Sequence, residues 1–123
     1  MGLNINGVSD VKIWQEVSSN KGEINSNYGW CVFHPDNGSE GKSQFQHVFE
    51  TLKRHRESRQ ALIIYTRPTM HTDAKRDGMS DFLCTISNQF FIRNNKLHMI
   101  YNMKGQDSVF GLFHNYPWSC YVY

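Results

Sequence analysis

Cys84 is the residue of this sequence whose surroundings best suit covalent chemistry. It follows a long polar stretch that contains Arg67, His71, Lys75 and Arg76, and it stands near the start of an apolar segment. A thiol becomes a strong nucleophile when nearby cations or a helix N-terminus favour the thiolate. The pattern therefore offers two interpretations of Cys84: a nucleophile, or a buried structural thiol of the kind that free cysteines commonly are.

The other cysteines and the histidines indicate neither a disulfide framework nor a metal site. Cys31 and Cys120 are widely spaced, and the total of three cysteines is odd, which fits a reducing compartment. The six histidines show no H-x-H or H-E-x-x-H spacing. We therefore expect Cys31 and Cys120 to be structural thiols, and we expect no bound metal.

Length and charge limit the classes of function that the chain can serve. Its 123 residues predict a single domain over 1–123, with a core that 8 Phe, 6 Tyr and 3 Trp are ample to fill. A net charge of +2 is too small to indicate a nucleic-acid partner. No stretch has the apolar length of a membrane span, and the N-terminus lacks the regions of a signal peptide. We expect a soluble protein of the cytoplasm.

The elements that would position Cys84 lack the strict strand–helix–strand order of a parallel sheet. Apolar residues at helical spacing predict helices, and apolar or β-branched runs predict strands. The predicted helices cover 11–19, capped by Ser9 or Asp10, and 44–58; the predicted strands cover 27–33, 61–66, 81–93 and 96–103. This order predicts an α+β fold in which helices pack on a mixed β-sheet.

Local patterns refine these elements. Asn94-Asn95 predicts a tight hairpin, because asparagine tolerates positive φ. The continuous apolar run 61–66 predicts a strand covered on both faces, and Pro117 predicts a helix start. Alternation along 81–93 predicts one face that carries Cys84, Ile86, Asn88, Phe90 and Ile92.

Four segments of the sequence carry a more specific signal than these patterns. They read KIWQEVSSNKGEINSNYGW, SRQALIIYTRPTMHTDAKRDGMSDFLCT, QFFIRNNKLHMIYNM and DSVFG. In wording and order they resemble the thymidylate synthase superfamily, and within it the phage deoxycytidylate 5-hydroxymethylases. The resemblance extends over nearly the whole chain from Lys12 to Tyr123. It implies that the chain forms the central portion of that family's fold.

The chemistry of this family would explain a cysteine at position 84. In the family, a thiolate adds to C6 of a pyrimidine monophosphate, and C5 then attacks the one-carbon unit of 5,10-methylenetetrahydrofolate. A synthase reduces the product to a methyl group, whereas a hydroxymethylase lets water add. The resemblance therefore implies that Cys84 is the nucleophile, that the folate is the cofactor, and that dUMP or dCMP is the substrate.

The resemblance also implies residues that bind the substrate. Tyr28 matches a pocket tyrosine, Gln89 matches a glutamine on the strand that follows the nucleophile, and Asp107 matches the aspartate of the family's Arg-Ser-x-Asp motif. Arg59 and Lys104 match positions that hold the nucleotide phosphate. The family's homodimer implies a partner subunit that packs through the sheet, and we expect Phe82, Phe90 and Ile92 to supply the apolar face.

Asn115 matches the position that reads the pyrimidine edge, and it disagrees with the overall similarity about the base. An asparagine amide offers an acceptor and a donor pair, which complement N3–H and O4 of uracil. Cytidylate hydroxymethylases carry Asp at this position, which suits cytosine. The contact residue therefore favours dUMP and the overall similarity favours dCMP, and we give the contact residue slightly more weight.

The sequence departs from the family at the phosphate site and in length. Gln60 replaces the second of two adjacent arginines, and Lys104-Gly105 replaces the family's Arg-Ser. Lysine lacks the bidentate geometry of arginine, and each lost charge-assisted hydrogen bond costs on the order of 1.5–3 kcal/mol. The segments that carry the family's catalytic glutamate and its His-x-Tyr are not found in the sequence.

Two hypotheses therefore remain open. The chain is a deoxypyrimidine-monophosphate hydroxymethyltransferase, or part of one, which would act in the cytoplasm of the host cell if a phage encodes it. Alternatively, it is a catalytically degenerate homologue that serves as a nucleotide-binding, regulatory or dimer-forming protein.

Overall fold

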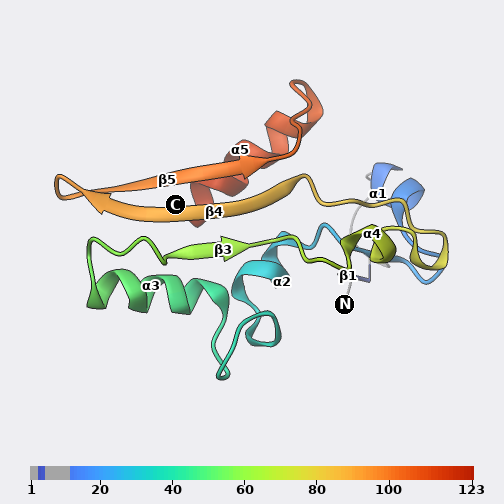
Figure 1. The fold of residues 1–123 in the computed structure, drawn as a ribbon. Helices are drawn as coiled ribbons and strands as arrows, with labels where there is room; N and C mark the ends of the chain where they lie inside the picture. Colours follow the sequence, from blue (N-terminus) through green and yellow to red (C-terminus); the bar gives the residue numbers. More distant parts are fainter. Residues whose placement is uncertain (1–2, 5–11) are drawn as a thin grey trace.

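The computed structural model describes residues 3–4 and 12–123, and Figure 1 shows their arrangement. The elements run in the following order: β1 (Leu3–Asn4), α1 (Lys12–Val17), β2 (Glu23–Ile24), α2 (Tyr28–Phe33), α3 (Gln44–Arg54), β3 (Leu62–Ile64), α4 (Met70–Asp73), β4 (Thr85–Arg93), β5 (Lys96–Met103) and α5 (Phe110–Val122). Short 3₁₀ turns cover Pro35–Asn37 and Arg76–Gly78. Of the predictions for the first helix, the caps Ser9 and Asp10 and its first residue, Val11, lie outside the described residues.

The main sheet has the strand order β3-β4-β5, and β4 and β5 form the predicted hairpin. Asn94 and Asn95 adopt φ angles of 51° and 59°, the left-handed conformation that a tight turn requires. Helices and a sheet confirm the predicted α+β class. The prediction of a mixed sheet is wrong for the described strands, because each of their pairings is antiparallel. The segment between β3 and β4 contains the short helix α4 and the 3₁₀ turn Arg76–Gly78, and it returns the chain antiparallel to β3.

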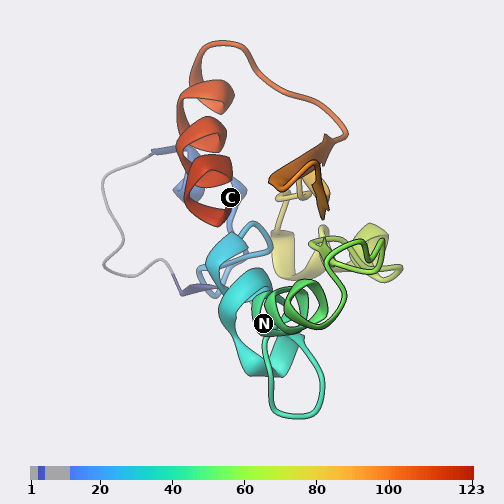
Figure 2. The ribbon, with the colours of Figure 1, turned by 90° about the vertical axis from the view of Figure 1, so that its left-hand side faces the viewer.

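The helices cover one face of the sheet and leave the other open. Figures 1 and 2 together show α2, α3 and α5 on the same side of the three strands. Ile63 points toward these helices and is fully buried, whereas its neighbours Leu62 and Ile64 are 41% and 48% exposed. The prediction that both faces of 61–66 are covered is therefore wrong for this chain by itself.

The core lies between the sheet and the helices. Its buried members include Val32 from α2, Val48 from α3, Phe90 from β4 and Val122 from α5. Burial of each such side chain contributes about 1.5–3 kcal/mol before entropy is counted. This core holds α2 and α5 against the strand that begins next to Cys84.

Helix α3 forms as its sequence predicts. The Ser43 hydroxyl accepts a hydrogen bond from the Gln46 N–H, and the Gln46 side chain accepts one from the Ser43 N–H. This reciprocal capping box defines the N-terminus of the helix. The helix ends at Arg54, four residues before the end of the predicted range 44–58.

Residues 28–33 form helix α2, so the predicted strand 27–33 is wrong. The Asn27 side chain caps the helix by accepting the Trp30 N–H at 3.0 Å. Cys31 and Val32 then lie together in the core, 3% and 0% exposed. A local capping group and tertiary burial outweigh the β-propensity of the aromatic residues here.

Two further details differ from the predictions. Pro117 lies inside α5 and does not start it. The start of this helix is stabilised from outside, by the Asp107 side chain. In β4, an irregularity in the register between Thr85 and Ser87 interrupts the alternation, so that Thr85 and Asn88 are both buried. Cys84 lies just before this bulge, and the predicted shared face with Asn88 is therefore wrong.

Candidate active site

A pocket of about 450 Å³ lies beside α1 and α5 and includes Cys84 in its wall. This volume is in the range of small-molecule sites. The residues that form its wall are largely apolar or aromatic, and a few of them are polar. Its residues include Trp14, Tyr28, Asp81, Cys84, Phe110, Gly111, Asn115 and Trp118. The pocket thus brings together three of the predicted site residues: Tyr28, Cys84 and Asn115.

The three cysteines have different surroundings. Cys84 is half-buried in the pocket wall, and its backbone carbonyl accepts the Lys104 N–H at 2.9 Å. Cys31 is 3% exposed in the core, and burial raises its pKa to about 11. The expectation of a structural thiol is confirmed for Cys31, whereas Cys120 is exposed on α5. Cys84 is therefore the thiol that a pocket ligand would meet.

The cations that precede Cys84 in sequence do not line its pocket. Arg67 pairs with Asp73 at 2.7 Å and donates to the Asn25 side chain at 3.0 Å. His71, with Arg67 and Lys104, lines a smaller neighbouring pocket of about 240 Å³. Lys75 and Arg76 are exposed. These cations are therefore near the thiol in sequence but do not line its pocket.

A hydroxyl network holds the backbone next to Cys84. The Tyr28 hydroxyl oxygen accepts the Thr85 N–H at 3.2 Å, and the Thr85 hydroxyl lies 2.7 Å from that of Tyr101. Burial raises the pKa of both Tyr28 and Tyr101, because the phenolate would be poorly solvated. Both hydroxyls therefore stay neutral and able to donate at physiological pH.

Asp81 is a pocket residue that the sequence analysis missed. Its carboxylate is 7% exposed and accepts the Ser26 N–H and the Ser26 hydroxyl, both at 2.6 Å. Its backbone carbonyl accepts from the Asn25 amide at 3.0 Å. These contacts attach the segment before Cys84 to the segment before α2. An acid three residues before the cysteine was visible in the sequence, but its partners lie more than 50 residues away in the chain.

Asp107 caps helix α5 and does not line the pocket. Its Oδ1 accepts the N–H groups of Val109 and Phe110, each at 2.8 Å. These backbone hydrogen bonds hold the pKa of Asp107 below its ordinary value. The next residue with a predicted role, Asn115, lies on α5 and is half-buried; its Nδ2 donates to Gln106 Oε1 at 3.2 Å.

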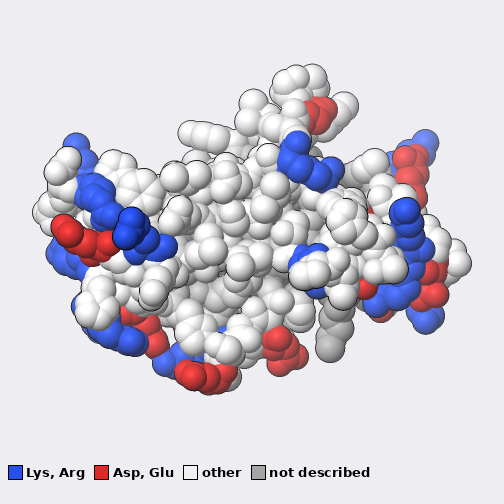
Figure 3. Space-filling model, in the orientation of Figure 1, with Lys and Arg blue, Asp and Glu red and all other residues white. Residues whose placement is uncertain are grey.

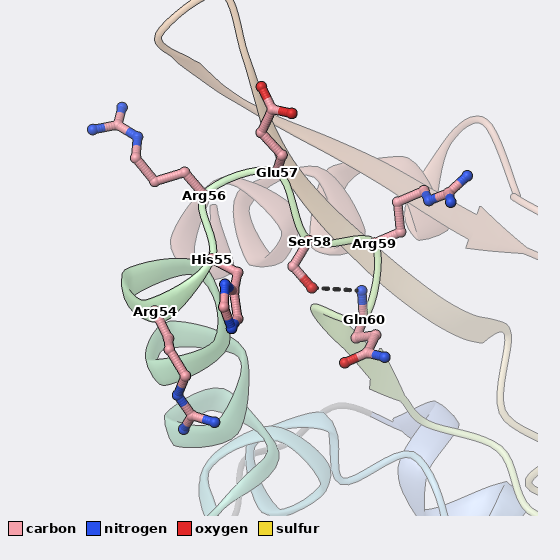
Figure 4. Close-up of a pocket in the computed structure, with 7 residues that line it drawn as sticks. All are labelled: Arg54, His55, Arg56, Glu57, Ser58, Arg59 and Gln60. Atoms are coloured by element: carbon pink, nitrogen blue, oxygen red, sulfur yellow. Dashed lines mark hydrogen bonds between the residues drawn. The ribbon is translucent and has the colours of Figure 1, made fainter.

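The predicted phosphate-site residues lie apart from the pocket. Lys104 packs its ammonium over the Phe82 ring, with the nitrogen 5.4 Å from the ring centroid. Gln89 lies on the open face of the sheet, opposite Leu62, and its amide donates to the Arg59 backbone carbonyl at 3.1 Å. Figure 4 shows Arg59 in the loop between α3 and β3, with its guanidinium directed outward. Within one chain, the pocket therefore lacks Arg59, Gln89 and Lys104.

The structure describes no metal centre and no membrane-spanning helix within residues 3–4 and 12–123. This part of the chain contains no cluster of three or more His, Cys, Asp or Glu side chains that could hold a metal ion. None of its helices has both the length and the apolarity to cross a bilayer.

Comparison with known proteins places the chain in a family. The family model described as thymidylate synthase matches residues 3–121. The chain belongs to the thymidylate synthase family. Its fold agrees, because thermostable thymidylate synthase A from Bacillus subtilis superposes with a TM-score of 0.64 at 21% identity, over 89% of this chain and 39% of that one.

Three curated proteins are similar to most of this chain and are considerably longer than it. The deoxycytidylate 5-hydroxymethyltransferases of Enterobacteria phages T4, T2 and T6 are each 46% identical to the chain over 111 residues. The match covers 90% of this chain and 44% of each relative. The chain thus spans less than half the length of these curated relatives.

Proposed function

We propose that this chain is part of an enzyme that transfers a one-carbon unit to C5 of a deoxypyrimidine monophosphate, either dUMP or dCMP. The observation that carries the proposal is Cys84, half-buried in the wall of a pocket that Tyr28 and Asn115 also line. A nucleophile, a hydroxyl and an amide around one cavity are suited to a polar heterocycle. The similarity to the phage hydroxymethyltransferases supports the same chemistry.

In the proposed reaction, the Cys84 sulfur forms a bond to C6 of the base. The electron pair of the C5–C6 double bond moves toward the C4 substituent, which leaves C5 nucleophilic. Asn115 contacts the base edge and helps to hold this charge. C5 would bond to the one-carbon unit and lose its proton, and the bond between that carbon and its carrier nitrogen would break, with the electron pair leaving on the carrier. Water, or hydride in a synthase, would then add to this carbon, and the S–C6 bond would break to restore the C5–C6 double bond and the thiolate. Tyr28 fixes the backbone at Thr85 and so keeps the sulfur in the pocket.

The pocket also suits the cofactor that the family implies. Trp14 on α1 and Phe110 at the start of α5 present aromatic surface to the cavity, on which a flat pterin ring would stack. Bound methylenetetrahydrofolate would supply the electrophilic one-carbon unit. These residues would orient the ring and exclude water from the reacting carbon.

A homodimer through the open sheet face would complete the site. In Figure 3 the middle of this face is largely free of charged side chains, which gather toward its two ends. Its exposed apolar members include Leu62, Ile64 and Ile100. The Arg59 backbone carbonyl accepts from the Gln89 side chain on this face, so we propose that Arg59 binds the phosphate in the partner's pocket, with Lys104 near the thiol of its own chain. The expectation that Phe90 belongs to the dimer face is wrong, because it is 3% exposed and packs in the core between the sheet and the helices.

The second candidate is a degenerate homologue that binds nucleotides, regulates or forms dimers without turnover. Asp107 favours it, because this carboxylate caps α5 and does not enter the pocket. Lys104-Gly105 and Gln60 favour it as well, since they weaken the proposed phosphate site.

Intact-protein mass spectrometry distinguishes the two candidates. The folded chain is incubated with methylenetetrahydrofolate and either 5-fluoro-dUMP or 5-fluoro-dCMP, because fluorine at C5 prevents the proton loss that releases the enzyme. We expect a mass increase equal to nucleotide plus folate, absent from Cys84→Ser and retained in Cys120→Ser. If neither analogue adds mass to a chain shown to be folded, this chain alone does not catalyse the reaction, and the degenerate homologue is favoured.

A further inference from the structure

Two hydrogen bonds at the start of α5 determine how the Asn115 amide is oriented. Gln106 Nε2 donates to the Asp107 backbone carbonyl at 2.8 Å. A backbone carbonyl can only accept, so Gln106 has to turn its nitrogen toward it. The oxygen of Gln106 consequently faces Asn115, whose Nδ2 donates to it at 3.2 Å. The nitrogen of Asn115 is thus held on the side of Gln106.

Gly111 supplies the space that this arrangement needs. A Cβ atom at position 111 would lie 2.9 Å from Gln106 Nε2 and 3.1 Å from the Asp107 Cβ. The first of these distances is shorter than a van der Waals contact, so the Gln106 side chain would have to move. The absence of a side chain at Gly111 therefore lets Gln106 fold back onto the helix and reach Asn115. Gly111 and Asn115 both line the pocket of Cys84.

The orientation of an amide matters because the two candidate bases present reversed patterns at N3 and C4. Uracil presents a donor at N3 and an acceptor at O4, whereas cytosine presents an acceptor at N3 and a donor at N4. An asparagine amide complements one pattern in one orientation and the other after a half-turn that exchanges its oxygen and nitrogen. A freely rotating asparagine would serve both bases, and a held one serves only one of them.

We propose that Gln106 determines base specificity by holding the Asn115 amide in a single orientation. The inference rests on the proposed function, in which Asn115 contacts the base. Gln106 is exposed and bonds to Asn115 and to the backbone, and it does not line the pocket. It is therefore a positioning residue, and Gly111 leaves the space that its side chain occupies.

The ratio of the dissociation constants of dUMP and dCMP tests the proposal. Isothermal titration would measure both nucleotides on the unmodified chain, on Gln106→Leu and on Gly111→Ala. We expect the unmodified chain to prefer one nucleotide. Each variant should bring the ratio roughly two- to tenfold closer to one, the factor that one neutral hydrogen bond represents. Most of this change should be tighter binding of the disfavoured nucleotide, since the Asn115 amide can then turn to exchange its oxygen and nitrogen.

Two controls separate specificity from loss of structure. Gln15→Leu exchanges an exposed glutamine of α1 in the same way and should leave the ratio unchanged. Gly111→Ala replaces a glycine by a better helix former, but the new Cβ also lies 3.1 Å from the Cβ of Asp107, so hydrogen exchange at Val109 and Phe110 has to show that the start of α5 is unchanged. Equal weakening of both nucleotides in Gln106→Leu, with an unchanged ratio, would overturn the inference and leave the proposed function intact. Failure of the unmodified chain to bind either nucleotide, with no Cys84 adduct, would overturn both.

Discussion

At the scale of single residues, burial distinguishes Cys31 from Cys84 and Cys120. It also makes the contribution of Cys31 to the free energy of unfolding depend on pH. The pKa of Cys31 is raised to about 11 from an ordinary value of 9.0, because burial disfavours the thiolate. The unfolded chain therefore loses this proton at lower pH than the folded chain. The stabilisation by Cys31 is fully present below pH 9 and is lost as the pH rises toward 11.

We therefore expect the free energy of unfolding to fall between pH 9 and pH 11, by about 2–3 kcal/mol from Cys31, since one pKa unit is about 1.4 kcal/mol. Urea unfolding at a series of pH values measures this. Cys31→Ala should be less stable at pH 7 and should show a shallower decline, whereas Cys120→Ala should keep the original pH dependence. A decline that is equally steep in Cys31→Ala would contradict the assignment. Tyr65, whose pKa burial also raises, acts in the same direction and stays in all variants.

Asp81 is the buried carboxylate whose loss should cost most near the thiol. In Asp81→Ala, the Ser26 N–H and hydroxyl lose their acceptors, which should lower the free energy of unfolding by about 1–3 kcal/mol. Asp36→Ala removes an exposed carboxylate and should change stability by less than about 0.5 kcal/mol. Urea denaturation measures both. Equal effects of the two changes would show that the Ser26 contacts contribute nothing.

At the scale of elements, the first turn of α5 depends on one carboxylate. Because backbone hydrogen bonds lower the pKa of Asp107, its stabilisation is present above about pH 4 and is lost as the pH falls through the folded-state value. We expect the amides of Val109 and Phe110 to lose protection from hydrogen exchange as the pH falls from 5 toward 2, after correction for the intrinsic exchange rate. In Asp107→Asn, which cannot titrate, protection should stay constant over this range. A decline of the same size in both proteins would exclude the cap as its cause.

A bulge near the start of β4 sets which residues of this strand face the core. It allows Thr85 to point into the core, where its hydroxyl meets Tyr101, while Cys84 lines the pocket. A regular strand would put residues 85 and 88 on opposite faces of the sheet, whereas both are buried here. Cys84 precedes β4, so the alternation of the strand does not set the direction of its side chain.

At the scale of the whole molecule, the open sheet face should control the oligomeric state. Ile64 is 48% exposed on this face, and a lysine there would place a charge in the proposed dimer interface. We expect Ile64→Lys to be a monomer under conditions where the unmodified chain is a dimer, as measured by light scattering after size exclusion. Phe49→Lys, on α3 and 60% exposed, should leave the dimer intact. A dimer that survives Ile64→Lys would place the interface elsewhere.

The dimer also bears on the phosphate. If Arg59 reaches the partner's pocket, a monomeric Ile64→Lys chain loses the arginine that contacts the phosphate. Its affinity for the nucleotide should then fall more than its affinity for the deoxynucleoside. The loss of affinity should therefore be larger for dUMP or dCMP than for the matching nucleoside, which lacks the phosphate. An equal loss for both ligands would assign Arg59 no role in phosphate binding.

The sequence by itself determined the features that depend on neighbours along the chain. The capping box of Ser43 and Gln46 and the helical spacing after it specify α3, and the asparagine pair at 94–95 specifies the hairpin. Cys84 could be selected as the candidate nucleophile, because its segment matches that of a known family. Each of these signals lies within a short window, where local hydrogen bonds and φ/ψ preferences decide the conformation.

Only the tertiary structure decided which distant residues meet. It made 28–33 a helix by burying Cys31 and Val32 in the core, against the β-propensity of the segment. It brought Ser26 to Asp81, and it placed Arg59 in the loop between α3 and β3, outside the pocket. The physical reason is that a pocket depends on which faces of the sheet and helices close upon each other. That closure minimises exposed apolar surface over the whole chain and is not set by any one segment.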